Sequence, residues 1–100
     1  MSTVYNVLNQ PLAMLKDKQI LNLSGQVLAT IADNHLERDG TVLVCWDGDK
    51  ILTRDGALFG KLCGREVQNM SRQTLATVSD DCAEPIVLAA AFMFFFVMTN

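Results

Sequence analysis

The most apolar stretch of the chain is the C-terminal segment Ile86–Met98, thirteen consecutive residues without a hydrogen-bonding side chain. Its phenylalanines are spread round a helical wheel, so a helix here has no polar face and must be buried on every side. Such a helix would be about 20 Å long at ~1.5 Å per residue, whereas a bilayer core requires roughly 20 residues. We therefore predict a helix in the core of the protein and not a membrane anchor.

The residues before this segment predict where the helix begins. Asp80 and Asp81 place negative charge near the end where the helix dipole favours it, and Pro85 suits a first helical turn. We place the helix at residues 85–98. A central strand is the competing interpretation, but Ala89–Ala91 favours a helix and thirteen residues is long for a strand.

From Ile20 onward the chain repeats with a spacing of 15 or 16 residues. The repeat is marked by the dipeptides Ser24-Gly25, Asp39-Gly40 and Asp55-Gly56, and one further step reaches Ser71-Arg72, which lacks glycine. Two-residue hairpin turns require positive φ at both central positions, and this favours Gly and Asp. The pattern predicts four hairpins over residues 20–81.

The segments that follow these turns align without a gap, at 27–31, 42–46, 58–62 and 74–78. Between the hairpins, opposite turns are predicted at Asp33-Asn34, Asp47-Gly48, Cys63-Gly64 and Asp80-Asp81. About eight strands at regular spacing are typical of an antiparallel meander. We therefore expect a mainly β fold, a barrel or a strongly curved sheet around the C-terminal helix.

A row of small side chains in the repeat indicates which strand face meets the helix. The row consists of Ala29, Val44, Gly60 and Ala76, whereas the opposite face carries Leu28, Leu43, Phe59 and Leu75. Small side chains allow a helix to lie close to a sheet. We expect the small row to face the helix, and a large residue at Gly60 would then overpack the core.

Residues 1–19 are predicted to form an N-terminal strand and turn. Val4–Leu8 alternates loosely, as an edge strand would, and Leu12–Lys16 is expected to add a helical turn. With 100 residues the chain is expected to be a single domain, made of this N-terminal part, the meander at 20–81 and the helix at 85–98.

Hairpins with a D-G turn, as in Ile51–Leu62, followed by an acidic and then apolar segment, as in Asp81–Met98, resemble the tubby, phospholipid-scramblase and LURP-one superfamily. The resemblance covers residues 20–98 and implies an antiparallel barrel around one hydrophobic C-terminal helix. Domains of that superfamily are longer and have more strands. The resemblance therefore implies a smaller barrel here, an incomplete one, or one completed by a second copy.

Composition narrows the classes of function. The net charge is −3, from 11 acidic and 8 basic residues, which disfavours nucleic-acid binding. No basic stretch precedes the first apolar residues, so a secretion signal is not expected. Cys45, Cys63 and Cys82 are odd in number and suit neither a disulfide framework nor a zinc site. We expect buried reduced thiols in a cytoplasmic protein. A peripheral association with a membrane is the second location that we consider.

Candidate catalytic chemistry is sparse. His35 is the only histidine and occupies a strand position, and no base is placed beside the Cys63 thiol by the repeat. The pair Asp47 and Asp49 lacks the rest of a calcium loop. The sequence therefore predicts no enzyme activity, no metal site and no cofactor.

Half of the positive charge lies in the third hairpin, at Lys50, Arg54, Lys61 and Arg65. One interpretation is an exposed strand face, on which the charged side chains keep the protein soluble and oppose pairing with a strand of another molecule. The other is a binding patch for an anionic ligand. We expect a non-catalytic binding or regulatory domain that acts on a protein partner or on a second copy of itself. The alternative is a protein associated with anionic phospholipid.

Overall fold

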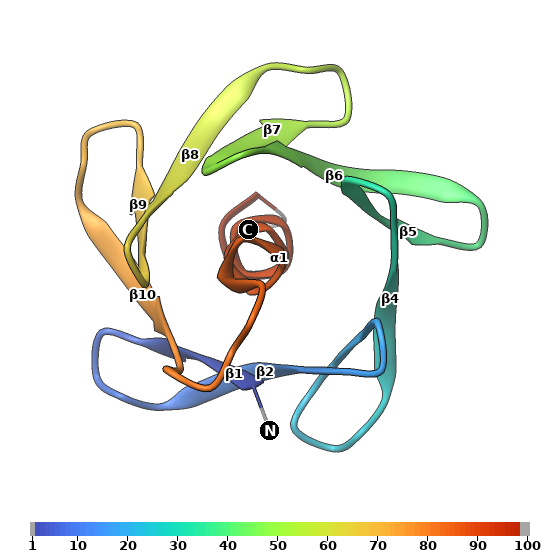
Figure 1. Ribbon diagram of the computed structural model, residues 1–100, viewed down its shortest axis with the longest axis horizontal. Coiled ribbons are helices and arrows are strands. Elements are labelled where there is room, and N and C mark those ends of the chain that lie inside the picture. The colour runs from blue at the N-terminus through green and yellow to red at the C-terminus, as the bar shows by residue number, and fades with distance from the viewer. Residues whose placement is uncertain (1, 99–100) are drawn as a thin grey trace.

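The computed structural model describes residues 2–98, and its elements are ten strands followed by one helical segment (Figure 1). The strands are β1 (Ser2–Asn6), β2 (Pro11–Lys16), β3 (Gln19–Leu21), β4 (Val27–Ala32), β5 (His35–Arg38), β6 (Thr41–Asp47), β7 (Lys50–Thr53), β8 (Leu58–Cys63), β9 (Glu66–Asn69) and β10 (Thr74–Val78). The helical segment is α1 (Pro85–Phe92), which continues as the π-helix η1 (Met93–Met98). The predicted mainly β fold and the predicted helix at 85–98 are confirmed.

The strands form a closed antiparallel meander, in which each strand pairs with its neighbours in sequence and β1 pairs with β10. At the closure, the Ser79 backbone N–H donates to the Thr3 carbonyl, and the Thr3 N–H donates to Ser79 Oγ, each at 2.9 Å. Figure 1 shows the helix in the middle of a ring of five hairpins. The barrel therefore closes within one chain, and no second copy is needed to complete it.

The structure has ten strands and not eight because the N-terminal residues form a fifth hairpin, β1–β2. The prediction of a helical turn at Leu12–Lys16 is wrong, since these residues lie in β2. Nor is the first strand an edge, because β1 pairs on both sides. Asn9, with φ of 62°, takes the left-handed place that Gly25 and Gly56 fill in their turns, so this turn, like the one at Ser71-Arg72, lacks the glycine signal.

The two ends of the barrel have different turns. Of the three predicted dipeptides, Asp39-Gly40 alone is a two-residue hairpin turn with positive φ at both central residues; Ser24-Gly25 and Asp55-Gly56 belong to longer turns in which glycine alone has positive φ. The other two-residue connections, at 17–18, 33–34, 48–49 and 64–65, lie at the opposite end. There the predicted turns at Asp47-Gly48 and Cys63-Gly64 are shifted by one residue, because Asp47 pairs with Lys50 and Cys63 with Glu66.

The core is built from cross-strand pairs that repeat in all five hairpins. In each, a residue of the first strand faces a smaller one of the second: Val4 with Ala13, Ile20 with Ala29, Leu36 with Val44, Ile51 with Gly60, and Val67 with Ala76. These side chains are buried against the helix. The prediction that the small row faces the helix is confirmed, and Ala13 extends it to the first hairpin.

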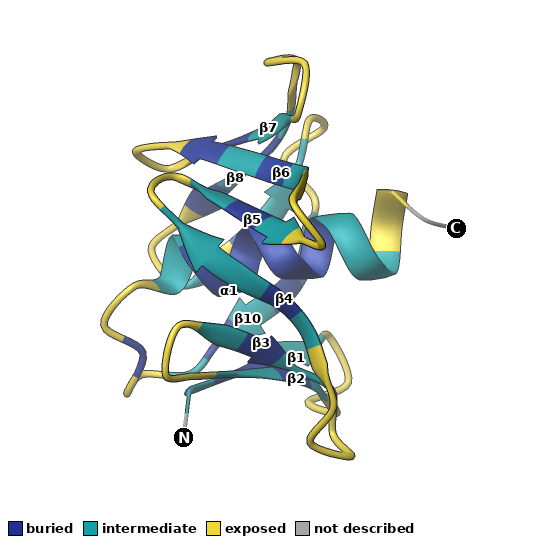
Figure 2. Cartoon of the chain, turned by 90° about the vertical axis from the view of Figure 1, so that its right-hand side faces the viewer, coloured by how far each residue is buried: buried dark blue, intermediate teal, exposed yellow. Residues whose placement is uncertain are grey.

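The helix passes through the barrel from one end, here called the base, to the other, here called the rim. The base comprises the connections at 17–18, 33–34, 48–49 and 64–65 and the segment 79–84; the rim comprises the hairpin turns at 7–9, 23–25, 39–40, 54–56 and 70–72 and the helix end Phe94–Met98. Figure 2 shows the last helical turn projecting beyond the strands. Within residues 2–98, no helix is long and apolar enough to cross a membrane.

Candidate functional site

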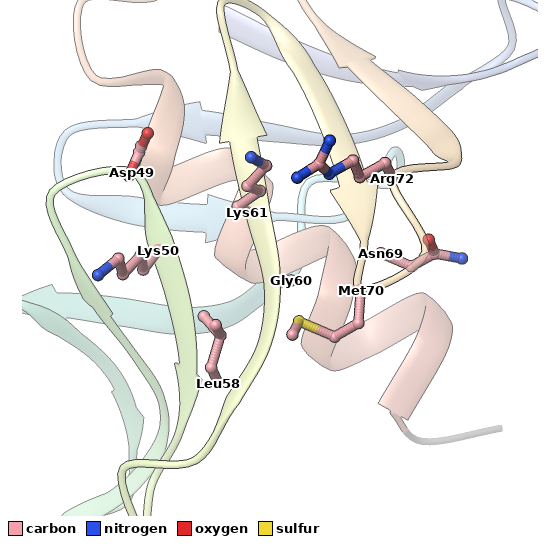
Figure 3. Close-up of a pocket in the computed structure, with 8 residues that line it drawn as sticks. All are labelled: Asp49, Lys50, Leu58, Gly60, Lys61, Asn69, Met70 and Arg72. Carbon is pink, nitrogen blue, oxygen red and sulfur yellow. The ribbon is translucent and has the colours of Figure 1, made fainter.

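A surface groove of about 390 Å³ lies over the hairpins β7–β8 and β9–β10 (Figure 3). Its lining comes from β7, β8 and the β9–β10 turn with the residues next to them: Asp49, Lys50, Leu58, Gly60, Lys61, Asn69, Met70 and Arg72. Gly60 lines the groove with its backbone alone, because a Cβ there would point inward to the helix, 2.8 Å from Met93 Cε. We call this the cation groove.

Two of the four predicted basic residues meet in this groove. Lys50 on β7 and Lys61 on β8 are directly opposite each other in the antiparallel pair. Like charges in opposite positions of a strand pair repel each other. Figure 3 shows the Lys50 ammonium directed away from Lys61, as this repulsion favours, and both lysines contribute positive charge to the lining of the groove.

Arg72 is a third cation of the groove, and sequence reasoning missed it. Figure 3 shows its side chain extending back toward Lys61. Arg72 has φ of 65°, in the left-handed region where the equivalent turns have Gly25 and Gly56. A left-handed conformation costs an ordinary residue about 1–2 kcal/mol. The missing glycine in the Ser71-Arg72 turn was the signal that could have found it.

Arg54 lies apart from the cation groove. It sits in the β7–β8 turn at the rim and lines another groove with Asp55, Phe94 and Met98. The structure therefore places this predicted site residue beside the end of the helix.

Arg65 holds the start of the helix to the barrel. One of its guanidinium nitrogens, Nη1, donates to the carbonyls of Ser79 and Cys82 at 2.7 and 2.9 Å, and its Nε lies 3.8 Å from an Asp80 carboxylate oxygen. The two N–H groups of this one nitrogen allow such a double contact. This geometry gives Arg65 a structural contact at the base.

The electrostatics of the cation groove favour an anion. Three cationic side chains line it against one carboxylate, that of Asp49. Leu58 and Met70 add exposed apolar surface, since 43% and 59% of their area is accessible. A ligand that combines negative charge with an apolar part would match both features.

The remaining chemical groups are dispersed. His35 Nε2 lies 3.3 Å from a Glu37 carboxylate oxygen on the outside of β5. Only Cys82 is buried, while Cys63 is exposed and Cys45 partly so, which corrects the prediction of three buried thiols. In the described part of the chain, no three potential metal ligands come together.

The fold is a small barrel of five β-hairpins closed around one helix, with the candidate site on the outer face of the strands. A family model described as the 5-fold beta-flower protein matches residues 1–97, so the chain belongs to this family. No curated protein and no solved structure gives a significant match.

Proposed function

We propose that the protein is a non-catalytic binding domain that recognises an acidic segment of a protein partner through the cation groove. The observation that supports this most is Arg72. A large cationic residue occupies a left-handed turn position where glycine or asparagine would be less strained, and its side chain lines the groove with Lys50 and Lys61. Strain of this kind, retained in a groove lined by other cations, is typical of functional sites.

An extended acidic peptide suits the shape of the groove. Lys50 and Lys61 lie toward the base, and Leu58 and Met70 lie toward the rim. Carboxylates can therefore pair with the cations while a neighbouring apolar side chain covers Leu58 and Met70. Because these groups are exposed, the interaction should weaken as salt increases.

The test is fluorescence anisotropy of a labelled Glu-rich peptide with one Leu, titrated with the wild-type protein and with Lys50→Glu/Lys61→Glu. We expect the double variant to lose binding by roughly tenfold or more, since two favourable charge contacts become repulsive. The matched control is Lys16→Glu/Lys18→Glu, which changes the net charge equally on the β2–β3 connection. Equal losses in both variants would show a general charge effect and contradict a defined groove.

The variant Arg72→Gly is expected to change peptide binding and the free energy of unfolding in opposite directions. We expect this variant to unfold at higher urea concentration, because glycine relieves a left-handed strain of about 1–2 kcal/mol, while it binds the peptide more weakly. Asn9→Gly is the control, since Asn9 has the same backbone conformation and lies outside the groove. Unchanged peptide binding in Arg72→Gly would remove Arg72 from the site.

An anionic phospholipid is the second candidate for this groove. It is favoured by the exposed Leu58 and Met70 beside the cations. The resemblance to the tubby, scramblase and LURP-one superfamily supports it, because a closed barrel around a C-terminal helix is the architecture of those domains. Competition of the labelled peptide by short-chain phosphatidylserine, but not by short-chain phosphatidylcholine, would assign the groove to a phospholipid.

A further inference from the structure

The exposed apolar side chains are confined to one end of the molecule. In the described residues, every exposed large apolar side chain lies in the rim half: Val7, Leu8, Leu23, Val27, Leu58, Met70, Val97 and Met98. Leu8 is the most exposed, with 74% of its area accessible. A grouping of this kind marks an interaction surface.

Three of the rim turns are braced so that an apolar side chain stays outside. In each, an asparagine side-chain oxygen accepts hydrogen bonds from two backbone N–H groups of the turn, and its amide donates to a glutamine four residues later. The residue that follows the asparagine is Val7, Leu23 or Met70. The repeat therefore holds an apolar group at the tip of each of these three hairpins.

Charge is divided unequally between the two ends. The rim turns and the residues next to them carry Arg38, Arg54 and Arg72 against Asp39 and Asp55. The connections of the base and the residues next to them carry Lys16, Lys18, Lys50 and Arg65 against a larger acidic set: Asp17, Asp33, Asp47, Asp49, Glu66, Asp80, Asp81 and Glu84. An anionic surface would repel the acidic base. The protein would therefore approach such a surface with its rim.

The helix end joins this surface. Phe94, Phe95 and Phe96 are half-buried, Val97 and Met98 are exposed, and the Arg38 guanidinium lies 5.5 Å from the centre of the Phe95 ring. An aromatic and apolar end with arginine nearby is the composition of membrane-interface segments.

We propose that the rim is a docking surface for a phospholipid bilayer, with the hairpin tips and the helix end in the headgroup region and the base in water. The shape favours a bilayer over a second copy. Figure 1 shows the hairpin turns projecting separately around the ring, and a fluid bilayer can accept separate side chains. A rigid partner would need a continuous complementary surface. This proposal does not rest on the ligand of the cation groove.

The experiment is flotation with vesicles of phosphatidylcholine alone and of phosphatidylcholine with phosphatidylserine. We expect the wild-type protein to bind the anionic vesicles more strongly. Leu8→Ser/Leu23→Ser should lower the vesicle partition coefficient by roughly tenfold or more, because two large apolar side chains no longer enter the interface. Val97→Ser/Met98→Ser should do the same from the helix end. The control is Cys63→Ser/Ala83→Ser, at exposed positions of the base.

Each outcome decides the proposal. Absence of flotation by the wild-type protein, or flotation that both rim variants retain, would overturn it. A wild-type dimer in light scattering that Leu8→Ser/Leu23→Ser converts to a monomer would assign the rim to a second copy instead. Peptide binding measured on the same rim variants is expected to be unchanged, so failure here is separate from failure of the cation groove.

Discussion

The base and the rim of the barrel are made from the same five hairpins and the same helix, yet they differ in nearly every physical property. Toward the base, neighbouring hairpins pair with each other. Between β8 and β9, for example, the pairing extends from Cys63 opposite Glu66 to Gly60 opposite Asn69. Closer to the rim, Leu58 pairs only within its own hairpin, with Leu52. The base is therefore a continuous barrel wall, and the rim is a set of separate hairpins.

The helix shows the same division along its length. The buried residues Val87–Met93 fill the barrel, whereas Phe94–Met98 are partly or fully exposed. The first part of the helix thus belongs to the core, and its last part forms an accessible surface. Substitutions near the base should therefore act on stability, and those near the rim should act on binding.

A large effect that would sharpen this comparison is expected from Gly60→Leu. A Cβ at this position would lie 2.8 Å from Met93 Cε and 3.0 Å from the Gln68 carbonyl oxygen. Overpacking typically costs about 1–3 kcal/mol, and the backbone contact should place this variant at the upper end. Urea unfolding measures the loss. Met93→Ala in the same chain should recover part of it, and a neutral Gly60→Leu would contradict close packing of helix and barrel.

The next effect is expected from Arg65→Lys, which keeps the charge and removes the Nη1 group that donates to the Ser79 and Cys82 carbonyls. Loss of these hydrogen bonds should lower the free energy of unfolding by about 1–2 kcal/mol. Arg54→Lys at the rim is the control and should change stability by less than about 0.5 kcal/mol. Similar losses in the two variants would show that Arg65 has no special structural role.

A smaller effect is expected from Asn69→Ala, which removes the acceptor for the Ser71 and Gln73 backbone N–H groups. The turn is exposed, so we expect a loss of about 1 kcal/mol in urea unfolding. Gln73→Ala removes only the side-chain contact and should cost less. The reverse order would contradict the bracing of the rim turns by asparagine.

The smallest effect concerns Asp81 at the base. The hydrogen bond from the Ser79 hydroxyl lowers the pKa of Asp81 below its ordinary value. A lowered pKa in the folded state adds stability above the unfolded pKa, and that stability is lost as the pH falls through the folded pKa. Ser79→Ala should raise the Asp81 pKa toward its ordinary value in a carboxyl NMR titration, whereas Ser79→Thr should leave it lowered.

Much of the fold was predictable from the sequence because its signals are local. Turn dipeptides such as Asp39-Gly40 and the small row around Gly60 fixed the hairpins and the inner face. The first hairpin was missed because Asn9 replaces glycine in its turn, and because five residues such as Leu12–Lys16 fit a strand as well as a helical turn.

The site was harder to predict because the groove joins separate hairpins. We predicted a shared site for Arg54, Arg65 and Lys50 because they are close in sequence. In the barrel, Arg54 lies at the rim and Arg65 at the base, so neither lines the cation groove with Lys50. Arg72 comes from the next hairpin and reaches the groove only through the pairing of β8 with β9. Such contacts depend on the register between hairpins, which charge patterns do not specify.

The most direct test of the account compares Leu88→Ala with Met98→Ala by urea unfolding. Leu88 is completely buried in the barrel, and Met98, at the rim, is 40% exposed. We predict a loss of about 2–5 kcal/mol for Leu88→Ala, because it leaves a cavity in the core. For Met98→Ala we predict a loss below about 1 kcal/mol, as for a surface substitution. Equal losses, or a greater loss at Met98, would contradict the division of the helix into a buried core and an accessible end.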